Sequence, residues 1–288
     1  MTDSLGLTFA ISLLIQAVFF AFAATLKTDK VTDLSYGLSF VIIAAVLLVR
    51  GDPSDWPQRV LAAMVIFWGL RLAGYLLFRI VHMGRDQRFD GVRENFLRFL
   101  RFWVFQGIAV WVIMLPVIVW FGSPGPWNVG MTIGAAIWAA GFLIEAIADA
   151  QKFAAKSRPG GESRWMDTGL WRYSRHPNYF GELLVWWGVF VYVAADLSPA
   201  QWVSIVGPIA ITFLLLRVTG IPTLEASASR KWGSNPDYLT YVARTSRLVP
   251  LPPKSPPVFA RERGAGRPTK RDRRDLDRLR QGTERTAP

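Results

Sequence analysis

Long apolar segments separated by short polar stretches make up most of the first 250 residues. Seven of them approach the roughly 20 residues that an α-helix needs to cross a bilayer. They cover residues 5–26, 34–49, 60–81, 102–121, 129–148, 180–195 and 202–221. The second and sixth are short, so we expect them to extend into their polar flanks or to lie tilted within the protein. The pattern predicts an all-α protein, a polytopic membrane helical bundle with about seven transmembrane helices.

The composition changes after Pro250, where the chain loses its apolar segments. A proline-rich run covers residues 252–257, and residues 261–285 are mostly charged. A segment with so few apolar side chains cannot bury a core. We therefore expect a transmembrane domain at residues 1–250 and a disordered cytoplasmic tail at residues 251–288. The basic tail either contacts anionic membrane lipid or is simply solvated.

The chain is basic, with 33 Lys and Arg against 21 Asp and Glu. Nucleic-acid binding is one meaning of such a balance, but these cations cluster in the loops and the tail of an apolar chain, which favours a membrane protein. The loops after the first, third and fifth apolar segments carry Lys or Arg, whereas those after the fourth and sixth carry none. This asymmetry predicts an integral membrane protein, in a bacterial inner membrane, with its N-terminus outside and its C-terminus in the cytoplasm. The sequence does not indicate an oligomeric state.

One dense polar cluster stands between the fifth and sixth apolar segments, and its core is Tyr173-Ser-Arg-His-Pro-Asn-Tyr-Phe-Gly-Glu182. Pro177 is expected to begin the sixth helix, with His176 and Asn178 at its N-terminus, where free N–H groups favour an anion. Arg175 adds a cation, and Glu182 follows Asn178 by one turn on the same face. Polar groups beside a bilayer commonly bind a ligand, so this cluster is the first candidate site. Metal binding is not expected, because the chain has only 2 His and no Cys.

Charged residues also occur inside the apolar segments. Glu145 and Asp149 are four residues apart on one helix face and are followed by Lys152, while Arg71 is followed four residues later by Tyr75. A buried Arg needs an acidic partner or a ligand. The available inward acids are Asp33, Glu145, Asp149 and Glu182. A polar ligand pocket and structural ion pairs between helices are both open as explanations.

The segment from Tyr173 to Glu182 also resembles the signature of an uncharacterised bacterial membrane family of the DUF1295 type, related to steroid 5-alpha-reductases. The wider clan includes sterol reductases and, more distantly, isoprenylcysteine carboxyl methyltransferases. The similarity runs from about Trp68 to about Pro250 and excludes the tail. It implies a steroid 5-alpha-reductase-like bundle that performs NADPH-dependent reduction of a conjugated carbon–carbon double bond in a lipophilic, steroid-like or isoprenoid substrate. Such an enzyme is an oxidoreductase of lipid metabolism.

The resemblance also implies functional residues. The cofactor-binding candidates are Arg71, Tyr75, Glu145, Asp149, Lys152, Lys156, Arg158, Tyr173, Arg175, His176, Asn178, Tyr179, Glu182 and Glu225. The catalytic candidates are Asp33, Tyr36, Trp68 and Glu182. Related steroid reductases use a Glu and a Tyr from the second and third helices, and this chain has no clean match to that pair.

Two alternatives to the reductase stay open at the level of sequence. Arg-His-Pro-x-Tyr and Glu225 also suit an S-adenosylmethionine-dependent membrane methyltransferase, whereas Glu182 and the run from Asp149 to Gly160 favour the reductase. The other alternative is a non-catalytic membrane scaffold. The chain has no G-x-G-x-x-G or Walker A motif, so a nucleotide would have to bind between the transmembrane helices.

Overall fold

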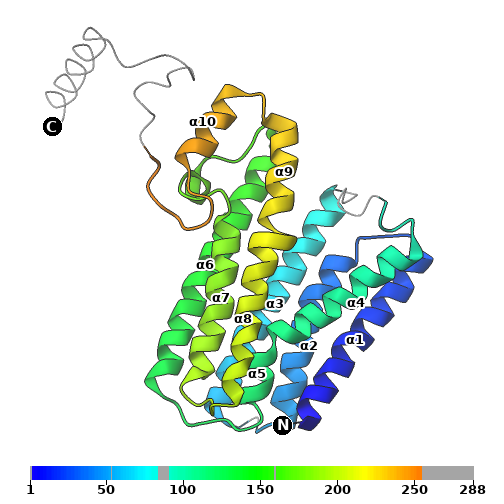
Figure 1. Ribbon diagram of the computed structural model, residues 1–288, viewed down its shortest axis with the longest axis vertical. Coiled ribbons are helices and arrows are strands. Elements are labelled where there is room, and N and C mark those ends of the chain that lie inside the picture. Colours follow the sequence, from blue (N-terminus) through cyan, green and yellow to red (C-terminus); the bar gives the residue numbers. More distant parts are fainter. Residues whose placement is uncertain (1, 53, 84–90, 159, 255–288) are drawn as a thin grey trace, which may run out of the picture. The chain divides into compact units, whose positions relative to one another are not determined.

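Helices form nearly all the regular structure in the computed structural model, which describes residues 2–52, 54–83, 91–158 and 160–254 (Figure 1). Within these residues there is no β-strand, and one isolated parallel bridge joins Ser174 to Ser246. The predicted all-α fold is therefore confirmed. The described residues all belong to the unit that ends at Lys254, and the rest of the expected tail lies outside them.

Six helical stretches of the described chain are long and apolar enough to cross a membrane. Five of them are α1 (Thr2–Thr25), α2 (Thr32–Arg50), α3 (Trp56–Met83), α4 (Phe96–Ile113) and α6 (Val129–Lys156). The sixth is the continuous stretch Gln201–Trp232. These helices fit an integral membrane protein whose apolar faces contact lipid. The predicted short second segment does extend into its polar flanks, because α2 begins at Thr32 and ends at Arg50.

The predicted sixth segment is α7 (Pro177–Ala194), which begins at Pro177 as expected. Its first two turns carry the polar side chains of Asn178 and Glu182, and α7 is not among the six candidate spans. α7 packs along the length of α6 (Figure 1). The two backbones meet at glycines: a Cβ atom on Gly181 would lie 2.6 Å from the Glu145 backbone nitrogen. This close contact brings the first turns of α7 against the acidic end of α6.

Two of the predicted spans are not the uniform helices that the apolar pattern indicated. The segment at residues 102–121 divides into α4 and α5 (Leu115–Trp120), because Pro116 lies in the first turn of α5 and has no N–H to continue the α4 hydrogen bonds. The last segment consists of η4 (Gln201–Ile205), α8 (Val206–Phe213), the π-helical η5 (Leu214–Val218) and α9 (Ile221–Trp232). Gly220 and Pro222 separate α9 from η5. Hydropathy did not predict this boundary, because the apolar run continues up to it.

An aromatic core joins α2, α3 and α7. The rings of Phe40, Trp68 and Trp186 lie 5.0–5.1 Å apart, centroid to centroid, and all three side chains are buried. Short elements close one end of the bundle: η2 (Gly161–Ser163), η3 (Gly169–Arg172) and α10 (Pro236–Arg244). Figure 1 shows α9 and α10 at the end of the bundle where α6 finishes and α7 begins. The polar signature therefore lies at the junction of these elements.

Candidate functional site

The signature segment is held in place by the chain that follows α10. The Arg175 backbone N–H donates to the Ser246 carbonyl at 2.8 Å, and the Ser174 hydroxyl donates to the Leu248 carbonyl at 2.6 Å. From the other side, the Trp171 indole N–H donates to the Ala148 carbonyl of α6 at 3.0 Å. These bonds fix the position at which α7 begins, with His176 as the residue before its first turn. Hydrogen bonds to α6 and to the chain after α10 therefore fix the backbone of the signature segment.

We call Arg175, His176 and Asn178 the helix-mouth residues, because they surround the N-terminus of α7. Glu225, from α9, faces them: its Oε1 lies 2.9 Å from Arg175 Nη1 and 3.3 Å from His176 Nε2. Its Oε2 lies 3.3 Å from Arg247 Nε. The structure thus places Glu225, a cofactor-binding candidate, beside the signature. Arg247 was missed by sequence reasoning, because no spacing rule links it to a cluster more than 70 residues earlier.

Three polar atoms of the helix mouth have no hydrogen-bond partner in the described part of the chain. They are Arg175 Nε, His176 Nδ1 and Asn178 Oδ1, and all three are buried. Buried polar atoms without a protein partner are rare, so each of these atoms is available to hydrogen-bond a ligand group or a water. Arg175 Nε can only donate, whereas Asn178 Oδ1 can only accept.

His176 is a neutral imidazole at physiological pH. Burial, helped by the positive charges of Lys152, Arg175 and Arg247, lowers the pKa of His176 from 6.5 to about 3. Desolvation of the ring is the largest of these effects on the pKa. When Nε2 carries the proton and donates to Glu225, Nδ1 becomes an acceptor for a ligand hydroxyl or amide.

A second cluster, the Arg71 cluster, lies between α3 and α6. The Arg71 guanidinium forms ion pairs with both Glu145 and Asp149, and the Trp68 indole N–H donates to the second oxygen of Glu145 at 2.9 Å. The side chains of Glu145 and Asp149 are only 3% and 8% exposed, while that of Arg71 is 15% exposed. Of the four acids that the sequence offered as partners for Arg71, the structure selects these two. The Arg71 Cζ also lies 5.8 Å from the centre of the Tyr75 ring, as their spacing predicts.

Glu182 lies beside the Arg71 cluster on the second turn of α7. Its side chain is buried and feels the charges of Glu145, Asp149 and Arg71, yet no described residue forms a hydrogen bond with it. Tyr36 of α2 lies close enough to Glu182 and Glu145 for their charges to act on its hydroxyl, and Asp33 acts on it from the preceding turn. Tyr36, Asp33 and Glu182 therefore lie in the same region of the bundle, while Trp68 donates to Glu145. Among them, Trp68 is fully buried and holds Glu145, which suits a positioning residue.

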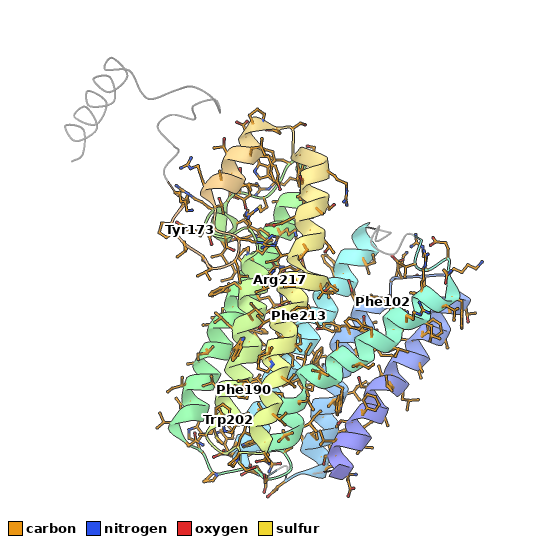
Figure 2. The ribbon with its side chains drawn as sticks, in the orientation of Figure 1. Phe102, Tyr173, Phe190, Trp202, Phe213 and Arg217 are labelled. Carbon is orange, nitrogen blue, oxygen red and sulfur yellow. The ribbon has the colours of Figure 1, made fainter. Side chains whose placement is uncertain are left out.

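The other cofactor-binding candidates are spread around the two clusters. The Tyr179 ring stacks on the His176 ring with centroids 5.8 Å apart, and Lys152 Nζ lies 4.9 Å from the centre of the Trp171 ring. Both residues therefore border the helix mouth. Tyr173 is exposed near the end of the bundle that carries α10 (Figure 2), where its carbonyl accepts from the Leu251 N–H.

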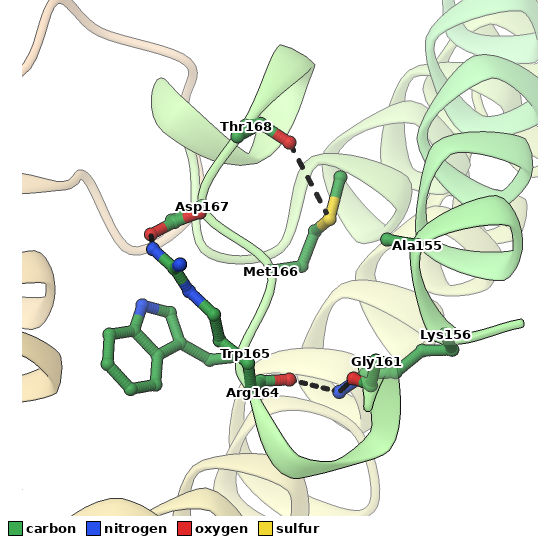
Figure 3. Close-up of a pocket in the computed structure, with 8 residues that line it drawn as sticks. All are labelled: Ala155, Lys156, Gly161, Arg164, Trp165, Met166, Asp167 and Thr168. Carbon is green, nitrogen blue, oxygen red and sulfur yellow. Dashed lines mark hydrogen bonds and ion pairs between the residues drawn. The ribbon is translucent and has the colours of Figure 1, made fainter. Parts of the chain in front are cut away.

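Lys156 and Arg158 lie away from both clusters. Lys156 Nζ donates to the Gly161 and Arg164 carbonyls beside a separate cavity of about 170 Å³ (Figure 3). Arg158 is exposed, and within the described residues it makes no hydrogen bond or ion pair with a helix-mouth residue. The structure thus supports Lys152 and Arg175 as the cations of the mouth more strongly than Lys156 or Arg158. No group of three acids or histidines in the described residues is arranged to hold a metal ion.

The fold and the site together define a helical membrane protein with charged groups buried among its spans. A sequence profile described as "Protein of unknown function (DUF1295)" matches residues 19–245. The chain therefore belongs to the DUF1295 family. No curated protein matches the chain. No solved structure matches it either.

Proposed function

We propose that this protein is a membrane-embedded reductase that uses NADPH to reduce a carbon–carbon double bond conjugated to a carbonyl in a lipophilic substrate. One observation carries the proposal: Arg71, Glu145 and Asp149 form buried ion pairs inside an apolar bundle, within range of the buried Glu182, and the helix mouth one turn before Glu182 has unpartnered polar atoms. A scaffold has no need for such groups, because buried charges are costly unless they serve binding or chemistry.

The residues of the helix mouth fit the polar groups of a nicotinamide dinucleotide. Arg175 Nε is an unpartnered donor near the α7 N-terminus, which suits a phosphate oxygen. His176 Nδ1 and Asn178 Oδ1 are acceptors, which suit ribose hydroxyls or the carboxamide N–H. Lys152 and Arg247 add positive charge at the same place. We therefore assign the phosphates to Arg175, Arg247 and Lys152, and the ribose and carboxamide to His176, Asn178 and Glu182.

When bound, NADPH supplies a hydride to the β carbon of the conjugated substrate. The chain's own contribution is to place the substrate carbonyl and stabilise the charge that develops on it. Tyr36 lies near Glu182, and its hydroxyl donates a hydrogen bond to the carbonyl oxygen in this proposal. The Trp68 indole holds Glu145 in place beside Arg71. A proton from solvent water then adds to the α carbon, which completes the saturated product and leaves hydroxide to be neutralised by the buffer.

The proposed function also implies a cellular location and an orientation in the membrane. The helix mouth must face the cytoplasm, because NADPH is available there, and the cation asymmetry of the loops predicts the same orientation. We therefore propose a bacterial inner-membrane protein with its N-terminus outside. A reporter fused after Ala150 should report the cytoplasm, and one fused after Gly125 should report the outside.

A second function is favoured by one feature of the Arg71 cluster. The acids Glu145, Asp149 and Glu182 outnumber the single guanidinium of Arg71, and an excess of carboxylates also suits a sulfonium cation. An S-adenosylmethionine-dependent methyltransferase is therefore the alternative. The two are separated by ligand-dependent thermal stabilisation of the purified protein. The reductase predicts stabilisation by NADPH that Arg175→Ala weakens, and stabilisation by S-adenosylmethionine alone would overturn it.

A further inference from the structure

A groove between α3 and α6 leads from the outer surface of the bundle to the Arg71 cluster. It has a volume of about 320 Å³ and is lined by Arg71, Tyr75, Phe78, Ala146, Asp149, Ala150 and Phe153. Phe78 and Phe153 form an aromatic wall, with ring centroids 5.1 Å apart. Ala146 and Ala150 lie one turn apart on α6, and their small side chains leave the groove open. Most of its lining is therefore hydrocarbon.

The groove lies in helices that are long and apolar enough to cross the membrane, so its surroundings are lipid. Leu70, Phe78 and Ile147 are exposed apolar side chains on the same two helices. A water-soluble ligand does not partition to such a surface, whereas a lipophilic molecule dissolved in the bilayer can reach it directly. The apolar walls therefore select a hydrocarbon body.

Arg71, at the inner end of the groove, determines which polar group a bound lipophilic molecule can carry. Within the Arg71 cluster the acids are nearly closed off, and the guanidinium is the more exposed partner, 15% against 3% and 8%. A molecule in the groove thus meets N–H donors, since a guanidinium has five of them and the two ion pairs do not use them all. Asp149, which also lines the groove, and Glu145 together carry more negative charge than Arg71 offsets, so they would repel an anion. A neutral acceptor such as a carbonyl oxygen fits this end, and a carboxylate does not.

We propose that this groove binds a lipophilic molecule carrying a neutral carbonyl, with the carbonyl oxygen accepting a hydrogen bond from Arg71. As the path by which a substrate reaches Tyr36 and Glu182, this assignment rests on the proposed reductase function. As a binding site for a lipophilic ketone, it stands on the shape and chemistry of the groove alone.

The test is photolabelling of the full-length protein in lipid nanodiscs, without added nucleotide. The probe is a long-chain α,β-unsaturated ketone with a diazirine next to the carbonyl, and the comparison probe is the same chain without the carbonyl. We expect labelled peptides from α3 and α6 around Phe78 and Phe153. The ketone should label them about 10-fold more strongly than the hydrocarbon, because a hydrogen bond to a charged donor is worth roughly that factor.

A filled groove provides the matched variant. Ala150→Trp should reduce labelling by the ketone about 10-fold, because the indole occupies the groove. Ala136→Trp is the control, since Ala136 is exposed on the same helix but lies roughly 20 Å away along its axis. Equal labelling by the two probes, or labelling unaffected by Ala150→Trp, would overturn the proposal. If the ketone labels the groove but NADPH does not bind the protein, the proposed reductase function is refuted and the groove is still supported as a ketone-binding site.

Discussion

Removing the charge of Arg71 should destabilise the protein strongly. In Arg71→Gln, the Glu145 and Asp149 side chains keep their burial, 3% and 8% exposed, but lose the ion pairs with Arg71. Breaking a buried ion pair by removing one partner costs about 3–5 kcal/mol. For a domain of this size each kcal/mol lowers Tm by roughly 2–4 °C, so the variant should melt roughly 10 °C lower. Thermal unfolding of detergent-purified protein measures this shift.

Two further variants decide whether burial is the cause. Arg164→Gln breaks an ion pair with Asp167 in which the Arg164 side chain is 68% exposed, and such a pair is worth about 1 kcal/mol or less. The double variant Arg71→Gln with Asp149→Asn removes one of the stranded carboxylates and should recover part of the lost stability. The reasoning is refuted if Arg71→Gln melts within about 1 °C of Arg164→Gln, or if the double variant melts lower than the single one.

Three other changes probe helix packing, His176 and the helix-mouth cations. Gly181→Ala should cost about 1–3 kcal/mol in a denaturation assay, because its Cβ would meet the α6 backbone, whereas Gly74→Ala, with nothing within 4 Å, should be neutral or stabilising. The lowered pKa of His176 means that its contribution to stability is full above pH 6.5 and is lost as the pH falls toward 3. His176→Gln should therefore flatten the decline of Tm between pH 7 and 5, and an unchanged slope would contradict a neutral buried ring. In titrations with NADPH, Arg175→Ala should raise Kd by about 10- to 100-fold, since a charge-assisted contact contributes roughly 1.5–3 kcal/mol. Arg247→Ala should raise it less, because the Arg247 side chain is 52% exposed, and the reverse order would argue against Arg175 as the main phosphate contact.

Much of the bundle follows from the positions of apolar residues. Hydropathy located each spanning segment, because lipid requires an apolar stretch of defined length. The start of α7 was predictable too, since Pro177 is suited to the first turn of a helix and cannot continue one. The break at Pro116 was equally visible in the sequence, but the apolar run around it is uninterrupted and hid the division into α4 and α5.

The candidate site was predictable where its members are close in sequence. Glu145 and Asp149 share a helix face by spacing alone, and the rule that a buried Arg needs an acid pointed Arg71 toward them. The Trp68 indole, in contrast, reaches Glu145 across 77 positions, and Arg247 reaches Glu225 from a different element. Such contacts depend on how the helices pack, which local pattern does not specify. The same holds for Tyr36, whose approach to Glu182 follows from the packing of α2 near α7.

The most direct test of the proposed reductase is a structure of the detergent-purified protein determined after incubation with NADPH. The account predicts density for the dinucleotide at the N-terminus of α7. Its phosphates should lie within hydrogen-bond distance of Arg175, and its nicotinamide should lie next to Glu182 and Tyr36. Density for S-adenosylmethionine in a parallel sample, with none for NADPH, would contradict the account.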